Sequence, residues 1–218
     1  MKILFIGNSY TYYNDSPKIF GALAEDNGKD VAVDAVTKGG RKLFENLDPE
    51  DENYKRIIEL TQKNHYDVLF LQEHSNLPIT CFDDFYRGAV GLCDLIKATR
   101  VILYTPWGYK EGSPKLDLLN LTNEEMTSKI YDAYESVGKE IGAQLSPVGL
   151  TFSAMKKTSP KTELYNPDMT HPSLIGSAIA AICHYKTLFG EIPQKRDTLP
   201  FFEIDSAVIE ALKFIDNH

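Results

Sequence analysis

The chain has 218 residues, of which 43% are hydrophobic, 25% charged and 11% aromatic. These proportions exclude a disordered tail, a collagen-like fibre and a coiled coil, and the length suits one domain over residues 1–218. The 31 acidic and 23 basic residues give a net charge of −8, which disfavours non-specific binding to nucleic acid.

The N-terminal segment and the cysteines bear on the compartment of the protein. No stretch approaches the roughly 18 apolar residues that a membrane helix needs. The apolar segment 3–6 is too short for the core of a secretion signal. Three cysteines at scattered positions do not form a disulfide framework. We therefore expect a cytoplasmic protein that does not bind a membrane.

Short apolar runs alternate with helical patterns from the N-terminus onward. A strand over 2–6 comes first, and Ser16-Pro17 then predicts the start of a helix that ends near residue 27. Thr122 and Glu125 form a capping box for a later helix. Loops are predicted over 106–121 and 158–171. The other predicted strands are 31–37, 67–72, 100–105 and 143–148, and the other main helices are 54–64, 82–98, 122–142, 149–157, 172–189 and 204–216.

This alternation of strands and helices predicts an α/β fold. Right-handed crossovers would place the strands in a mostly parallel, five-stranded sheet inside a three-layer α/β/α sandwich. The run 67–72, DVLFLQ, is almost wholly apolar, as expected of a central strand that is covered on both faces. Ligands bind such sheets at the carboxyl ends of the strands. The candidate functional residues are therefore those that directly follow a predicted strand.

Polar and small residues follow three of the predicted strands. An aspartate and a histidine also lie just before the helix predicted over 172–189. Ser9 lies in the turn after the first strand, Gly39-Gly40 follows the second, and the segment QEHSN follows the third. Asp168 and His171 lie three residues apart. Each of these signals is weak alone, since a Gly-Asn-Ser turn is also typical of plain turns and phosphate-binding loops.

Together these residues match the requirements of nucleophilic catalysis. A serine nucleophile needs a histidine base, and the histidine needs a carboxylate on its other ring nitrogen. Ser9, His171 and Asp168 supply those three groups. An oxyanion also needs preorganised donors. The backbone N–H groups of Ser9 and Gly40, with the side chain of Gln72 or Asn76, are the candidate donors.

Four segments resemble the sequence blocks of the SGNH (GDSL-type) hydrolases. The segment ILFIGNSYT resembles the first block, and VTKGG resembles the second block with its glycine. The segment VLFLQEHSN occupies the position of the third block, and DMTHPSLIGSAIAA resembles the final block. Their order and spacing match from residue 2 to about residue 188. The resemblance implies a flavodoxin-like sandwich and a serine esterase without a cofactor that acts on small acyl groups.

The chain departs from the family pattern in two blocks. Asn8 replaces the usual Asp of the first block, and the third block lacks a clean Gly-x-Asn-Asp. The third block is more similar to that of sialate and carbohydrate O-acetylesterases, which implies acetyl esters of carbohydrates as substrates. Gln72 is our first choice as side-chain oxyanion donor and Asn76 the second. Gly40 is preferred to Gly39 because it directly precedes the next helical pattern.

Several alternatives remain open from the sequence. A non-catalytic domain would use the Ser9 turn to bind a phosphate or nucleotide, although no dinucleotide or Walker fingerprint follows the first strand. Glu73 and His74 are expected to hold loop geometry or to contact substrate. The spacing of the acidic and histidine residues matches no compact metal-ligand motif. The tyrosines near Ser9 are suited to stacking on a sugar ring or to packing.

Overall fold

The computed structural model describes residues 1–195, 197–199 and 206–213. Within these residues, the strands form one parallel sheet in the order β2-β1-β3-β4-β5. The strands are β1 (Lys2–Gly7), β2 (Ala32–Thr37), β3 (Val68–Leu71), β4 (Arg100–Tyr104) and β5 (Gln144–Ser146). This order is that of the flavodoxin-like α/β proteins, so the predicted fold class is confirmed.

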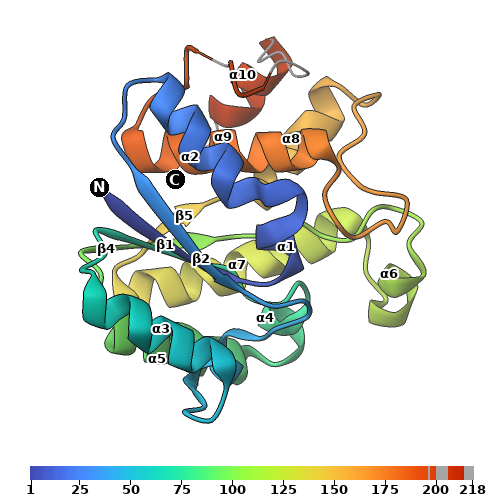
Figure 1. Cartoon of the computed structure of the whole chain (residues 1–218). Coiled ribbons are helices and arrows are strands. Elements are labelled where there is room, and N and C mark those ends of the chain that lie inside the picture. The colour runs from blue at the N-terminus through green and yellow to red at the C-terminus, as the bar shows by residue number, and fades with distance from the viewer. Residues whose placement is uncertain (196, 200–205, 214–218) are drawn as a thin grey trace.

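Helices cover both faces of the sheet (Figure 1). In chain order they are α1 (Ser9–Tyr12), η1 (Tyr13–Asp15), α2 (Ser16–Asp26), η2 (Leu43–Leu47), α3 (Glu52–Lys63), α4 (Leu77–Thr80), α5 (Phe82–Ile96), α6 (Pro114–Leu119), α7 (Asn123–Ile141), α8 (Val148–Thr158), α9 (Leu174–Phe189) and α10 (Ser206–Leu212). On one face lie α2, α8, α9 and α10, and on the other α3, α5 and α7.

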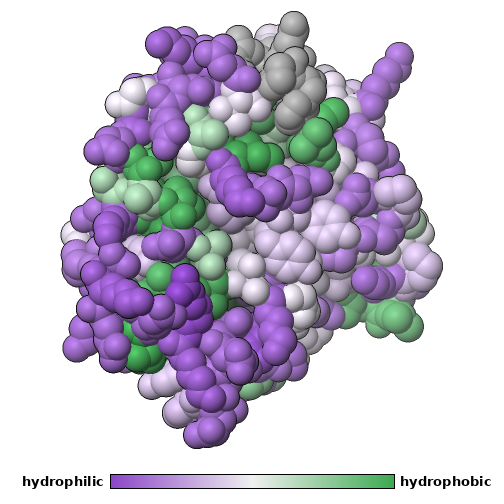
Figure 2. Space-filling view, viewed as in Figure 1, coloured by the Kyte–Doolittle hydropathy of each residue, from purple (hydrophilic) through white to green (hydrophobic). Residues whose placement is uncertain are grey.

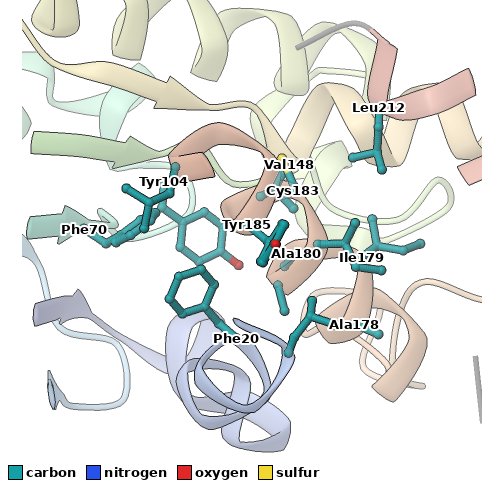
Figure 3. Packing of buried hydrophobic residues seen from close by; sticks show 14 of the residues in the cluster. Phe20, Phe70, Tyr104, Val148, Ala178, Ile179, Ala180, Cys183, Tyr185 and Leu212 are labelled. Carbon is teal, nitrogen blue, oxygen red and sulfur yellow. The ribbon is translucent and has the colours of Figure 1, made fainter. Parts of the chain in front are cut away.

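The alternating side chains of the strands divide the core into two halves. Phe5 and Phe70 stack at 4.4 Å and pack with α2 and α9. Figure 3 shows Phe20 of α2 beside Phe70 in this half. On the opposite face, Leu4 and Leu69 pack against α3, α5 and α7. Because a strand residue and its neighbour point to opposite faces, the central strands β1, β3 and β4 each supply both halves of the core.

The position of β1 creates a crevice at the carboxyl edge of the sheet. The second strand β2 pairs with one side of β1, and β3 pairs with its other side, with Ile6 opposite both Val36 and Leu71. The connections that leave β1 and β3 therefore run to opposite faces, and ligands of open α/β sheets bind at such a switch point. The chain segments that follow β1, β2 and β3 all begin there.

Most predicted elements are present with small changes at their ends. The capping box of Thr122 and Glu125 is confirmed at the start of α7. Of three short helices, α1 and α6 occur where the sequence analysis predicted a turn and a loop, and α4 occurs in a segment to which it assigned no element. They span four to six residues, which is too short for a helical period to show in the sequence. Part of the last predicted helix, 204–216, lies outside the described residues.

His184 of α9 is an uncharged histidine in the core. Its Nδ1 lies 2.7 Å from the hydroxyl of Ser146, and its Nε2 has no hydrogen-bond partner among the described residues. The ring packs between Phe70 and Tyr104, at 5.1 and 4.3 Å. Burial lowers the pKa of His184 to about 3, because the charged ring would lose its hydration.

This histidine should make the stability of the protein depend on pH. An unfolded chain takes up the proton near pH 6.5, whereas folded His184 takes it up only near pH 3. Between these values the unfolded state binds more protons, so the free energy of unfolding falls with falling pH, by about 1.4 kcal/mol per unit from this group. Urea unfolding between pH 7 and 4 should give a flatter profile for His184→Gln than for the wild type. An exposed control, His65→Gln, should keep the wild-type slope, and parallel profiles for all three would contradict the expectation.

Candidate active site

Ser9 is the first residue of α1, directly beyond the end of β1. The turn is tight at Gly7, where an added Cβ would lie 2.2 Å from Oγ1 of Thr11. Asn8 caps the helix, because its side-chain oxygen accepts the N–H of Tyr10 at 3.2 Å. The chain therefore enters α1 with Ser9 in its first turn, where the residue lines a pocket.

Ser9, His171 and Asp168 form a chain of hydrogen bonds. The hydroxyl of Ser9 lies 2.8 Å from Nε2 of His171, and Nδ1 of that ring lies 2.5 Å from Oδ2 of Asp168. The other carboxylate oxygen accepts the N–H groups of Thr170 and His171, each at 2.9 Å. Both oxygens thus have fixed partners, and Nε2 is the nitrogen that faces the serine.

The hydrogen bonds to Asp168 keep its carboxyl group ionised. Partial burial alone would raise its pKa, but the N–H of Thr170 and the ring and N–H of His171 stabilise the anion and lower the pKa to about 2. A carboxylate on Nδ1 selects the tautomer in which Nε2 is free to accept a proton. The arrangement can therefore take a proton from the hydroxyl of Ser9.

Aromatic rings hold the imidazole of His171 in place. Tyr13 stacks on it at 4.3 Å with an angle of 13° between the planes, and Tyr10 meets it edge-on at 5.6 Å. Tyr10 in turn stacks on Trp107, whose Nε1 donates to the carbonyl of Thr170 at 3.0 Å. Two of the tyrosines near Ser9 therefore pack against the histidine.

A pocket of about 600 Å³ opens beside Ser9 and His171. Five segments of the chain line it, which places Ser9, Gly40, Asn76, Tyr109 and His171 around one space. The lining residues are Asn8, Ser9, Tyr10, Tyr12, Tyr13, Gly39, Gly40, His74, Ser75, Asn76, Tyr109, Lys115, Leu118, Leu119, Thr170 and His171. This volume accommodates a small ligand.

Gly40 belongs to the loop after β2, which is tied to the turn that carries Ser9. The side-chain N–H of Asn8 donates to the carbonyl of Arg41 at 3.0 Å, and Arg41 pairs with Asp51 at 2.6 Å. Gly40 itself has φ +67°, a conformation that favours glycine. An aspartate in place of Asn8 would have no N–H for this carbonyl, which gives the family departure at this position a structural role.

The structure does not place Gln72 in the pocket, so our first choice of side-chain donor needs correction. The side chain is buried, and its oxygen accepts the N–H of Asn8 at 3.1 Å and the hydroxyl of Thr11 at 2.8 Å. Its nitrogen donates to the carbonyl of Glu73. The amide oxygen therefore holds the start of α1 in place, and Gln72 is not among the residues that line the pocket.

Asn76, the second choice, does line the pocket. Its Oδ1 lies 3.1 Å from Nδ1 of His74. The ring nitrogen is the donor in such a contact because Oδ1 can only accept. Because the oxygen of Asn76 is bound to His74, the side-chain N–H groups of Asn76, which have no partner among the described residues, are the atoms that can donate to a ligand.

Glu73 and His74 follow β3 but face different surroundings. Glu73 is fully buried, and its carboxylate accepts the N–H of Leu43 at 3.1 Å and that of His74 at 2.5 Å. Burial raises the pKa of Glu73 to about 8, against these hydrogen bonds, which lower it. Glu73 therefore holds the geometry of two loops, whereas His74 lines the pocket.

The region between β4 and α7 contributes a wall of the pocket that the sequence analysis did not identify. Tyr109, Lys115, Leu118 and Leu119 come from it. Ser113-Pro114 marks the start of α6 with the same Ser-Pro sequence that predicted the start of α2 at Ser16-Pro17, although Ser113 is the N-cap of its helix and Ser16 is the first residue of α2. This signal would have located the helix, although not its place at the pocket.

Among the described residues, no three His, Cys, Asp or Glu side chains gather so as to hold a metal ion. Within the same part of the chain, no helix combines the length and the apolar character needed to cross a membrane.

Comparison with known proteins identifies the family of this chain. Neither a known protein family nor a curated protein matches the sequence. Among solved structures, the chain is 30% identical to a protein from Slackia heliotrinireducens assigned to the SGNH hydrolases; the match covers 86% of this chain and 98% of that one, with a TM-score of 0.74.

Two more distant structures share the fold. A DUF4886 family protein from Bacteroides uniformis is 18% identical over 99% of this chain and 92% of its own, with a TM-score of 0.75. The acetylxylan esterase Axe2 from Geobacillus stearothermophilus is 18% identical over 89% and 97%, with a TM-score of 0.61. The extent of the Slackia match, together with the common fold, shows that this chain belongs to the SGNH hydrolases.

Proposed function

We propose that the protein is a serine esterase that hydrolyses short acyl esters, with acetyl esters of carbohydrates as the favoured class. The observation that carries this proposal is the chain of hydrogen bonds from Ser9 through His171 to Asp168, at 2.8 and 2.5 Å, on the wall of a ligand-sized pocket. In this assignment Ser9 is the nucleophile, His171 the general base and Asp168 the residue that orients the base.

The reaction follows from these positions. Nε2 of His171 takes the proton of Ser9 while the serine oxygen forms a bond to the ester carbonyl carbon. The resulting oxyanion is bound by the N–H groups of Ser9 and Gly40 and the side chain of Asn76. When the bond to the alcohol oxygen breaks, His171 gives its proton to the leaving alcohol. Water then attacks the acyl-enzyme in the same way, releasing the acid and restoring Ser9.

Three observations favour acetyl groups on a sugar. The acetylxylan esterase with the same fold acts on an acetylated carbohydrate, and the third block of the sequence resembles that of carbohydrate O-acetylesterases. Tyr12, which is 40% exposed, and Tyr109 bring aromatic side chains to the pocket. Aromatic rings suit the apolar faces of sugars.

The alternative of a phosphate-binding turn is less well supported. The helix that Ser9 begins has only four residues, which limits the dipole that would attract a phosphate. A phosphate site would also give no role to the contact between Ser9 and His171. We therefore retain the esterase as the proposed function.

Replacing the nucleophile tests the proposal directly. Ser9→Ala should abolish hydrolysis of 4-nitrophenyl acetate while the free energy of unfolding stays close to wild type, because a half-buried turn serine contributes little packing. A fluorophosphonate should add its mass to the wild type at Ser9 and leave the variant unlabelled. Substantial turnover by Ser9→Ala, or an unlabelled wild type after long exposure, would refute the role of Ser9.

Asp168→Asn should lower kcat strongly without unfolding the protein. The variant's oxygen can still accept the N–H groups of Thr170 and His171, which turns its NH₂ toward Nδ1 of His171. The ring would then carry its proton on Nε2 and could not act as a base; the same change costs about 10⁴ in kcat in a serine protease. The measurement is kcat on 4-nitrophenyl acetate above pH 6, where Asp168, with its pKa of about 2, is ionised. A rate near wild type would mean that another group orients the histidine.

The two amides after β3 should respond differently to truncation. Asn76→Ala should lower kcat by about 10²–10³ with little change in KM, because an oxyanion donor acts in the transition state. Gln72→Ala should instead lower the free energy of unfolding, because the N–H of Asn8 and the hydroxyl of Thr11 lose their acceptor. Each buried donor left without a partner costs about 1–3 kcal/mol of stability. Kinetics and urea unfolding of both variants check this ranking. A stable Gln72→Ala with the larger loss of kcat would reverse it.

A further inference from the structure

The pocket beside Ser9 differs in charge from the rest of the chain. The whole sequence carries a net charge of −8, yet among the described residues that line the pocket there is no Asp or Glu. Asp168, the nearest carboxylate of the proposed mechanism, is engaged by Nδ1 of His171 on the side away from Ser9. Lys115 is the lining residue with a permanent positive charge. A positive pocket on an acidic protein attracts anions that the remaining surface repels.

The ammonium group of Lys115 lies over an aromatic ring in this pocket. Its Nζ is 5.3 Å from the ring centroid of Tyr109, and the hydroxyl of that tyrosine is 2.8 Å from the hydroxyl of Ser75. Within the described ranges, no carboxylate forms a salt bridge with Lys115, whereas Lys110, five residues earlier, pairs with Glu163 at 2.5 Å. The ring contact positions the ammonium group but leaves its N–H donors for a ligand.

The helix that carries Lys115 is fixed to the body of the protein. Ser113 is buried and caps α6 through the N–H of Lys115, and Leu116 packs into the core on the α7 side of the sheet. The same helix presents Leu118 and Leu119 to the pocket, and Leu118 is 86% exposed. Figure 2 shows hydrophobic side chains at the right edge, over α6. One wall thus combines a cation with apolar side chains.

A second lysine adds to the positive potential beyond His74. The Nζ of Lys42 lies 5.7 Å from the ring centroid of Phe44, and no salt bridge joins it to the described carboxylates. Burial lowers the pKa of His74 and the charges of Lys42 and Lys115 lower it further, while the hydrogen bond to Asn76 and the charge of Glu45 act in the opposite direction. The fields of both lysines therefore reach the same ring on the pocket wall.

We propose that the ester substrate carries a carboxylate, which the ammonium group of Lys115 binds while the carbon skeleton lies against Leu118 and Leu119. Lys115 is then a specificity-determining residue rather than a catalytic one. The inference rests on the proposed esterase function and deepens it by naming the substrate class, an anionic short-chain acyl ester.

A matched pair of esters separates charge from shape. The probes are 4-acetoxybenzoate, which carries a carboxylate, and the neutral 4-acetoxybenzamide. Lys115→Met should lower kcat/KM for the anionic ester by about three- to tenfold, as expected for a partly exposed ion pair, and leave the neutral ester within twofold. Lys115→Arg should keep the preference. Lys139→Met, near the end of α7, makes the same change in net charge away from the pocket and should change neither rate.

Binding to Ser9→Ala tests the inference separately from hydrolysis. Titration of this variant should give a lower Kd for 4-acetoxybenzoate than for 4-acetoxybenzamide, and adding Lys115→Met should remove the difference. Hydrolysis of both esters with no effect of Lys115→Met on their ratio would overturn the inference and leave the esterase proposal standing. Selective binding that depends on Lys115, without hydrolysis of either ester, would instead refute the esterase proposal and retain the anion site.

Discussion

One buried amide oxygen fixes the position of the nucleophile candidate. The side-chain oxygen of Gln72 accepts hydrogen bonds from the backbone N–H of Asn8, the N-cap of α1, and from the hydroxyl of Thr11 within α1. The backbone N–H of Gln72 also extends the pairing of β3 with β1, through the carbonyl of Ile6 at 2.9 Å. The turn that carries Ser9 is thus attached to the adjacent strand at two levels. Without this acceptor, the buried N–H of Asn8 and the hydroxyl of Thr11 would lose their shared partner at the start of α1.

The residues that follow Gln72 extend the same arrangement to the neighbouring loops. Glu73 holds the N–H of Leu43, three residues beyond Gly40. Asn76 then faces the pocket, with its oxygen held by His74. The donors proposed for the oxyanion therefore come from segments that are linked to each other through five consecutive residues after β3. A fixed set of donors needs little reorganisation as charge develops, which is the condition for electrostatic stabilisation.

The sequence was sufficient to predict the parallel sheet, its three-layer arrangement and the grouping of Ser9, Asp168 and His171. The grouping could be predicted because the carboxyl ends of parallel strands meet at one edge of the sheet. The sequence was insufficient for the choice between Gln72 and Asn76. A polar amide at the end of an apolar strand can face a ligand or be paired with backbone groups, and the sequence does not distinguish the two. Alternation along β3 puts Gln72 on the same face as Phe70, and α1 covers that position only because the chain folds into a single helical turn after β1. The wall formed by α6 was missed because a helix of one or two turns has no period to detect, and because the Ser113-Pro114 signal at its start does not reveal that the helix lies at the pocket.

The packing around His171 gives the protein an internal optical reporter. Trp107 is the single tryptophan of the sequence, and its ring lies between Tyr10 at 4.7 Å and Phe152 at 4.4 Å. Its indole N–H is bound to the carbonyl of Thr170, the residue next to His171. All tryptophan emission from the chain therefore arises one side chain away from the Ser9 turn, in a water-excluded site. Intrinsic fluorescence of the unlabelled protein consequently reports on this one location, so that local rearrangement at the pocket and global unfolding are both visible without an added dye.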